Sequence, residues 1–278
     1  MAAKLEVLIC TFGKDGLDRV AAMGLPRVDG VGYLVSWQKG TREVSVGRPQ
    51  GLMRDDVKVY VSPTVGLSRN RNAALAHATG DICLVADDDL RYTDAGLRAV
   101  MDAFDRRPDM DVAAFMYESD GDTKEYPRQE CDLTRHIPKG WFLTSFELAF
   151  RRGSIGPLRW NELLGIGAPV LSAGEEELLL WQMRRHGLRC RFIPETIAVH
   201  DGPTTGFRRV AEPSVLMSKG AVWRVTHPYT APLRIILNAW RERRAGRMSF
   251  VHALRHVTKG YAYAMRNLDS QGNPRVTT

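Results

Sequence analysis

The sequence predicts an α/β protein with a mostly parallel central sheet flanked by helices, followed by a C-terminal helical extension. Three observations lead to this prediction. Over the first 117 residues, short apolar runs alternate with stretches of helical periodicity, as in proteins with parallel sheets. The apolar runs are continuous, which is typical of strands buried on both faces. Beyond residue 210 the pattern becomes helical and basic.

The clearest elements lie in the first half of the chain. Five strands are expected, at Leu5–Cys10, Val31–Trp37, Val57–Val61, Ile82–Ala86 and Asp111–Met116. Helices are expected around Leu17–Met23, at Leu67–Ala78 and from Asp94 to Phe104. Ser68 is expected to cap the second helix, and Thr93 or Asp94 the third. The stretch between the second and third strands is rich in Gly, Arg and Pro, so it is expected to be a loop.

The second half of the chain is less regular. The expected elements are a strand at Phe146–Phe150, a Gly-rich loop at Trp160–Ala173, a helix at Glu175–His186, and short strands at Arg189–Ile193 and Ile197–His200. From Ser214 onward we expect helices. We therefore place one domain at residues 1–210, with halves at 1–117 and 118–210, a basic helical extension at 211–268 and a flexible tail at 269–278.

The composition is that of a globular protein suited to anionic partners. The 278 residues carry a formal net charge of +7 and give a pI of about 9.4, which favours nucleic acid, a phospholipid surface or a phosphorylated small molecule. The four cysteines form no CxxC pair, and Cys10 and Cys83 lie in apolar runs, so we expect buried thiols in a reducing cytoplasm. We expect neither a secretory signal nor a membrane span, because no stretch of about 18 apolar residues occurs. The expected location is the cytoplasm, with peripheral contact at the inner face of the membrane allowed.

Side chains with useful chemistry gather where the predicted strands end. In open α/β sheets, ligands bind beyond the carboxyl ends of the strands. Those positions are Thr11–Gly13, Gln38–Lys39 and Asp87–Asp89. The three adjacent carboxylates repel one another, and Mg²⁺ or Mn²⁺ completed by substrate phosphates would relieve that repulsion. A solvated acidic turn ahead of a helix would explain the same three residues.

Three further patterns each allow a structural and a chemical interpretation. Ser68–Asn72 is either a polar helix start or a source of arginines for a phosphate or a base. Gly174–Glu177 either complements a helix dipole or supplies the carboxylate that deprotonates an acceptor hydroxyl. His200 ends a predicted strand and is either structural or a metal ligand.

Taken in order, these motifs resemble the family 2 glycosyltransferases, which have the GT-A fold. The resemblance covers roughly residues 4–206 and is carried by Thr11-Phe12-Gly13, Ser68–Asn72 through Gly80-Asp81, Asp87-Asp88-Asp89, Phe150-Arg151-Arg152, Gly165-Ile166-Gly167 and Gly174-Glu175-Glu176. It implies a nucleotide-binding, Rossmann-like half at residues 1–117 and an acceptor half at 118–210. The chain departs from the family at Gln38 and Leu90, where acidic residues are usual, and at Glu176, where Asp is frequent.

The resemblance also implies roles for individual residues. The nucleotide-sugar site would comprise Thr11, Phe12, Gly13, Gln38, Arg69, Arg71, Asp87 and Asp88. The divalent metal, Mn²⁺ or Mg²⁺, would be held by Asp89 and His200. Glu176 matches the position of the catalytic base, and its neighbour Glu175 is the other candidate.

The function that the resemblance implies is inverting sugar transfer by a hexosyltransferase-like enzyme. The donor would be a nucleotide-diphosphate sugar, with uridine favoured by family frequency. The acceptor would be the hydroxyl of a glycan, a lipid-linked molecule or a small molecule, in polysaccharide, glycolipid or other glycoconjugate synthesis. No nucleic acid partner is expected.

Two alternative functions stay open. A nucleotidyltransferase acting on sugar phosphates would also present acidic metal sites beyond parallel strands, although Thr11–Lys14 is short for a Gly-rich phosphate loop. A non-catalytic nucleotide- or nucleic-acid-binding protein would use the basic surface instead.

The positive charge gathers at the C-terminus, from Arg234 to Arg266. Basic helices with apolar faces can lie on anionic membranes, which would suit a lipid-linked acceptor. A helix packed on the catalytic domain with a solvated basic face would produce the same pattern.

Overall fold

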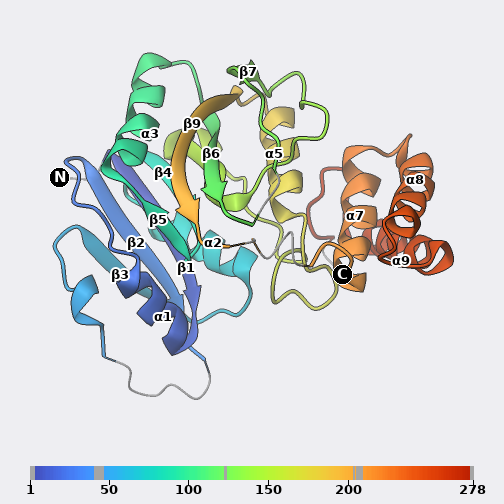
Figure 1. Ribbon diagram of the computed structural model, residues 1–278, viewed down its shortest axis with the longest axis horizontal. Coiled ribbons are helices and arrows are strands. Elements are labelled where there is room, and N and C mark those ends of the chain that lie inside the picture. The colour runs from blue at the N-terminus through green and yellow to red at the C-terminus, as the bar shows by residue number, and fades with distance from the viewer. Residues whose placement is uncertain (1–3, 41–46, 122–123, 203, 205–208, 276–278) are drawn as a thin grey trace. The chain divides into compact units, whose positions relative to one another are not determined.

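The computed structural model describes residues 4–40, 47–121, 124–202, 204 and 209–275 (Figure 1). The chain divides into two compact units. The first unit consists of Met1–Val65, Arg69–Leu158 and Met183–Thr204. The second unit consists of Gly66–Ser68, Arg159–Gln182 and Thr205–Thr278.

The first unit is built on one sheet, which has nine strands within the described residues. The bounds are β1 Leu5–Phe12, β2 Val31–Gln38, β3 Val57–Ser62, β4 Ile82–Ala86, β5 Leu90–Tyr92, β6 Val112–Ser119, β7 Cys131–Asp132, β8 Leu148–Arg151 and β9 Cys190–His200. The spatial order is β3-β2-β1-β4-β8-β6-β9-β5, with β7 paired to β9. Parallel pairs join β3, β2, β1 and β4, and also β6 and β9, whereas β8, β5 and β7 pair antiparallel with their neighbours. Most strands therefore share one direction, and the predicted fold class is confirmed.

The helices of this unit connect the strands so that the strand order reverses between β1 and β4. They are α1 Gly13–Ala22, α2 Leu67–His77, of which residues from Arg69 belong to this unit, α3 Asp94–Arg106 and α4 Arg152–Ile155. From β1 the chain moves through α1 to β2 and β3, and it then returns through α2 to β4 on the other side of β1. Because such crossovers are right-handed, α1 and α2 cover opposite faces of the sheet. Ligands of open α/β sheets bind where the strand order reverses, which is here beyond the carboxyl ends of β1 and β4.

The core explains why the apolar run of β1 is continuous. Leu5, Val7 and Ile9 pack in one cluster with side chains of α1 and α3. Successive side chains of a strand point to opposite faces, and Leu8 and Cys10 are also buried. Burial raises the pKa of the Cys10 thiol to about 12, so this cysteine is an inert core residue, as the sequence predicts.

Two strands differ from the sequence-based expectation. The two short strands expected near residues 189–200 form one strand, β9, which continues through Pro194. Its register with β6 shifts between the Ala114–Phe192 and Met116–Thr196 pairs, and this bulge accommodates a residue that has no N–H to donate. β5 has only three residues, too few to show a periodicity.

The two expected helix caps have different outcomes. Thr93 caps α3, with its side chain accepting a hydrogen bond from the Gly96 amide at 3.0 Å. Ser68 does not precede α2 but lies within its first turn. Its hydroxyl donates to the carbonyl oxygen of Leu164 at 2.7 Å, within the second unit.

The second unit contains the C-terminal helices α7 Pro213–Thr226, α8 Ala231–Arg244 and α9 Phe250–Asn267, together with the start of α5 Glu175–Arg185. In Figure 1 the three C-terminal helices are coloured orange to red. α7 and α9 cross at backbone contact, because a Cβ atom at Gly260 would lie 1.7 Å from the Met217 carbonyl oxygen. The predicted helical extension is confirmed. Among the described residues, no helix is long and apolar enough to cross a membrane.

Candidate active site

The acidic triplet lies in the turn between β4 and β5, at the edge where the strand order reverses. β5 pairs antiparallel with β9, so that Leu90 stands opposite His200. This register brings Asp89, the residue before β5, to the end of β9. The Asp89 Oδ2 and His200 Nε2 atoms are 3.3 Å apart. The structure therefore joins the two residues that the family resemblance assigns to the metal, although they are 111 positions apart.

The hydrogen bonds of His200 fit a metal ligand. Its Nδ1 atom lies 2.9 Å from the Gly202 carbonyl oxygen, which can only accept, so Nδ1 carries a proton. In the neutral form of His200 the Nε2 lone pair faces the Asp89 carboxylate, and in the protonated form Nε2 donates to it. Two acceptors that face each other require a cation between them, either a proton or a metal ion. A backbone carbonyl that holds the far nitrogen of the ring is the usual support of a metal-binding histidine.

The Asp89 carboxyl group is ionised at neutral pH. Burial alone would raise the pKa of Asp89, but the hydrogen bond and charge of His200 outweigh burial and hold that pKa below its ordinary value. The Asp89 side chain is 43% exposed, so its oxygens remain within reach of a ligand. A carboxylate and an imidazole are both ligands for Mn²⁺, and carboxylate suits Mg²⁺.

The described residues hold no group of three or more His, Cys, Asp or Glu that could bind a metal ion. A metal at Asp89 and His200 would therefore take its other ligands from water and from the substrate. Mg²⁺ in phosphoryl-substrate sites commonly does so, keeping several waters beside one or two carboxylates. The two residues thus fit a metal that binds together with a diphosphate.

The other two carboxylates of the triplet have cationic partners in the protein. Asp87 accepts hydrogen bonds from Arg71 and from the Ser145 hydroxyl, each at 3.3 Å. Asp88 accepts two from the Arg19 guanidinium, at 3.1 and 2.9 Å, and one short hydrogen bond from the Thr11 hydroxyl. Arginines thus offset the repulsion that the sequence predicts at Asp87 and Asp88, and the metal hypothesis rests on Asp89.

Arg19 is a site residue that sequence reasoning misses. It lies in the last turn of α1 and 69 positions from Asp88. A single arginine on an amphipathic helix has the same sequence signature as any solvated surface arginine. Only the packing of α1 beside the β1 end of the sheet reveals its place.

A buried network of Lys124, Glu147 and Tyr126 holds two residues that contact the site. Lys124 donates to Glu147 and to the Thr144 hydroxyl, and Glu147 also accepts from the Tyr126 hydroxyl. Both Lys124 and Glu147 have almost fully buried side chains. The network fixes the short 3₁₀ turn Ser145–Glu147. In this turn the Ser145 hydroxyl donates to Asp87. The Phe146 ring of the same turn stacks on His200 at a centroid distance of 5.9 Å.

The predicted nucleobase residues lie at the ends of β1 and β2. Phe12 ends β1 with 55% of its surface exposed, whereas Gln38 at the end of β2 is buried. The Gln38 amide donates to the Thr64 hydroxyl at 2.9 Å. The two strand ends are tied together by Asn70, whose side-chain amide donates to the carbonyls of Thr11 and Ser36 at 3.1 and 3.0 Å. An exposed aromatic ring beside fixed polar groups is a suitable surface for a planar base.

The start of α1 excludes a long phosphate loop. β1 ends at Phe12 and α1 begins at Gly13, with no residue between them. Gly13 has a φ of +70°, a conformation that favours glycine. The Trp37 indole donates to its carbonyl at 2.9 Å.

The two arginines of the Ser68–Asn72 motif have different environments. Arg71 is buried and pairs with Asp87. Arg69 is exposed on the same helix. Arg71 therefore organises the acidic turn, and Arg69 is the one that a phosphate or base could approach.

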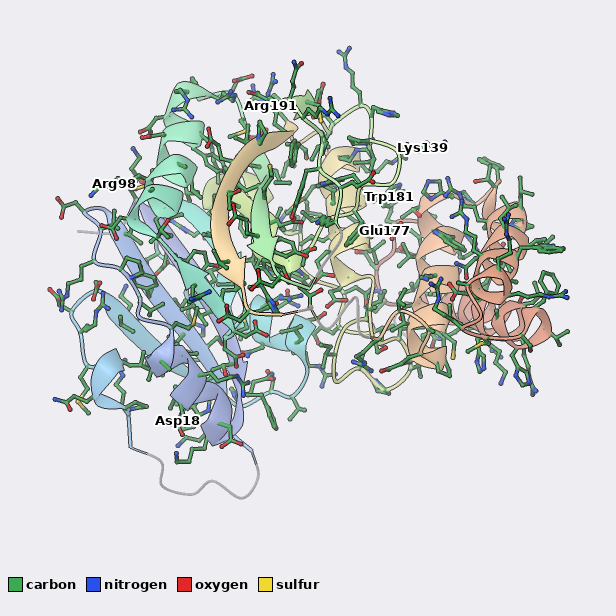
Figure 2. All side chains as sticks on the ribbon, viewed as in Figure 1. Asp18, Arg98, Lys139, Glu177, Trp181 and Arg191 are labelled. Carbon is green, nitrogen blue, oxygen red and sulfur yellow. The ribbon has the colours of Figure 1, made fainter. Side chains whose placement is uncertain are left out.

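The two candidate base residues belong to the second unit, in the first turn of α5. Glu175 is buried next to Gly165, where a Cβ atom would lie 2.9 Å from its Oε1 atom. Glu176 is half-buried, and Glu177, labelled in Figure 2, is exposed. Because the Glu175 side chain is buried and Glu176 is half-buried, Glu176 is the better candidate for a base.

The comparisons with known proteins agree with the fold. The family description "Glycosyl transferase family 2" matches residues 36–212, which include the acidic turn, the start of α5 and His200. The chain therefore belongs to glycosyl transferase family 2. No curated protein sequence matches the chain.

Among solved structures, the chain is similar to residues 1–349 of TarS from S. aureus. That structure shares 11% identity and a TM-score of 0.56, over 99% of this chain and 97% of that chain. The complex of the same TarS fragment with UDP-GlcNAc gives 12% identity and 0.56, over 99% and 97% of the two chains. The complex of the TarS fragment with UDP shares 13% sequence identity and has a TM-score of 0.53. The match covers 95% of this chain and 90% of that chain. At these identities the likeness shows the fold.

Proposed function

We propose that this glycosyltransferase transfers a sugar from a uridine-diphosphate sugar to a hydroxyl acceptor, with inversion and with help from Mn²⁺ or Mg²⁺. The observation that carries the proposal is the Asp89–His200 pair at the edge where the strand order reverses. Its support comes from family membership and from the fold likeness to TarS, whose structures include complexes with UDP and UDP-GlcNAc.

In the proposed reaction the donor diphosphate lies beside Asp89 and His200. A bound divalent ion would neutralise the charge that develops on the departing diphosphate. Asp88 and Asp87, which pair with Arg19 and Arg71, are proposed to orient the sugar and ribose hydroxyls. Phe12 stacks on the base, and Arg69 approaches the phosphates.

Glu176 is proposed as the general base, on the family resemblance and on its half-buried place in the first turn of α5. It takes the proton from the acceptor hydroxyl as that oxygen attacks the anomeric carbon and the bond to the diphosphate breaks. A single displacement of this kind inverts the anomeric configuration.

The donor nucleotide is tested directly by isothermal titration calorimetry with UDP, CDP, GDP and ADP, each with Mn²⁺ and with EDTA. We expect UDP to bind most tightly and its affinity to fall by about tenfold or more without the metal, because the diphosphate then meets Asp89 unshielded. Equal affinity for all four nucleotides would contradict the uridine assignment. Equal affinity with Mn²⁺ and EDTA would contradict the metal assignment.

The nucleotidyltransferase alternative is not favoured by the direct junction of β1 and α1, because that junction leaves no room for a Gly-rich phosphate loop. Its distinguishing product is pyrophosphate. Release of pyrophosphate from UTP and a sugar phosphate would support it over sugar transfer.

A further inference from the structure

The helix α8 carries apolar side chains on two opposite faces. On one face, Ile235 and Ala239 are buried in a cluster with residues of α7 and α9. On the other face, four large apolar residues are 46–58% exposed, and we call them the α8 stripe: Leu233, Ile236, Leu237 and Trp240. All residues of α8 are described. Packing within the second unit therefore explains only half of the apolar character of this helix.

The spacing of the α8 stripe makes it one continuous surface. Its members stand at positions i, i+3, i+4 and i+7 of the helix. Successive helical residues are rotated by about 100°, so this spacing lines one side of a helix. Single exposed apolar side chains are ordinary, but a contiguous exposed patch marks an interaction surface. Tyr229, which lies just before the first residue of α8 and is 97% exposed, adds an aromatic side chain near the N-terminus of this helix.

The charge around the α8 stripe is of one sign. Residues 213–268 contain ten Lys and Arg and a single acidic residue, Glu242. Glu242 is 1% exposed and turned inward, where it pairs with Arg247 at 2.7 Å and Lys219 at 3.7 Å. By contrast, Arg241, Arg243 and Arg244 at the end of α8 are exposed.

Trp240 joins the apolar and the basic parts of this surface. The Arg243 guanidinium lies over its ring at 5.6 Å from the centroid. The indole is 51% exposed and packs edge-on against Phe250, the first residue of α9, at 5.9 Å. A tryptophan beside arginines is typical of the boundary between acyl chains and headgroups, where its ring is partly apolar and partly wet.

From these contacts we propose that α8 docks on an anionic lipid surface, with the α8 stripe among the upper acyl chains and the flanking arginines against the phosphate headgroups. Apolar insertion and headgroup attraction together give stable interfacial binding, and neither alone is sufficient. Nucleic acid would satisfy the arginines but leave the four apolar side chains against phosphates. With 14 residues, α8 lies on the membrane and does not cross it. The proposal is independent of the sugar and of the acceptor.

The apolar half of the proposal is tested by sedimentation of the full chain with two kinds of vesicle, phosphatidylcholine alone and equal parts phosphatidylcholine and phosphatidylglycerol. Wild-type protein is expected to bind only the second kind. The variant Leu237→Ser with Trp240→Ser should bind at least about tenfold more weakly. The matched control, Met53→Ser with Val61→Ser, changes two exposed apolar residues of the first unit and should bind as wild type does.

The charged half is tested by Arg241→Glu with Arg244→Glu, which should weaken binding by about a hundredfold. Its control is Arg98→Glu with Arg128→Glu, which makes the same change in net charge at two exposed positions of the first unit; Arg98 is labelled on α3 in Figure 2. This control should keep vesicle binding close to that of wild type. Because all four positions are exposed, these variants test the proposal even if the serine variant fails to fold.

Three results would overturn the proposal. The first is unchanged vesicle binding by the Leu237→Ser, Trp240→Ser variant, with a circular dichroism spectrum like that of the wild type. Binding would then depend on charge alone, as it does for nucleic acid. The second is equal loss in the Arg98→Glu, Arg128→Glu control. The third is a wild-type dimer in light scattering that the serine variant dissociates, because the α8 stripe would then contact a second copy of the chain.

Discussion

The Asp89→Asn variant is expected to lower the turnover of a nucleotide sugar by about a hundredfold to a thousandfold. The amide keeps the shape of the side chain but removes the charge that faces His200 across 3.3 Å. Losing one preorganised group that stabilises developing charge costs about this much in rate. The metal-dependent part of the UDP affinity should be lost as well, because the remaining metal ligand is a single imidazole. Turnover is measured as release of UDP, and affinity by calorimetry.

A matched control separates this effect from a general loss of acidity. Asp18→Asn removes an exposed carboxylate of α1, labelled in Figure 2, which pairs with Lys14 at the surface. Its turnover should equal that of the wild type. If the Asp89→Asn variant turned over the donor at the wild-type rate with an unchanged response to Mn²⁺, the assignment of Asp89 would be wrong.

The Glu176→Gln variant is expected to lose about a hundredfold to ten-thousandfold in rate while keeping its affinity for UDP. Glutamine retains the size of the side chain but cannot accept the proton of the attacking hydroxyl. Hydrolysis of the donor is a sufficient assay, since the same base would deprotonate a water molecule that replaces the acceptor. Rate and affinity together identify a group that acts only in the chemical step.

The neighbours of Glu176 supply the comparison. Glu177→Gln alters an exposed side chain of the same helical turn and should leave the rate unchanged. Glu175→Gln alters a buried side chain packed beside Gly165, so we expect it to lower the melting temperature. A full rate in the Glu176→Gln variant, with a loss in either neighbour, would move the role of base to that neighbour.

The order of β1, α1, β2, β3, α2 and β4 could be predicted from the sequence because short, mostly apolar runs mark the strands and helical spacing marks α1. The end of α2 is marked by Gly80. Asp87–Asp89 directly follow a predicted strand, and ligands of open α/β sheets bind beyond the carboxyl ends of strands, so the sequence marks them as candidates. The reversal of the strand order at β1 and β4 is seen only in the structure. The pairing of Asp89 with His200 could be predicted for a different reason. It required the family resemblance, since nothing in the local sequence joins residues so far apart.

The remaining features depend on tertiary packing. Arg19 and Ser145 reach Asp88 and Asp87 only because α1 and the 3₁₀ turn pack beside the acidic turn. The buried Lys124–Glu147 pair has no sequence signature, because most lysines and glutamates lie in solvent. The two faces of α8 were also hidden, since an apolar periodicity does not show which residues a neighbouring helix covers.

The central claim is metal-assisted sugar transfer from a uridine-diphosphate donor, and the most direct test is a panel of nucleotide sugars with Mn²⁺. Release of the nucleoside diphosphate is followed for each donor by wild-type protein, with and without EDTA. We predict release of UDP from at least one uridine-diphosphate sugar and suppression of that release by EDTA. Failure to turn over any nucleotide sugar, with Mn²⁺ or with Mg²⁺, would contradict the proposed function.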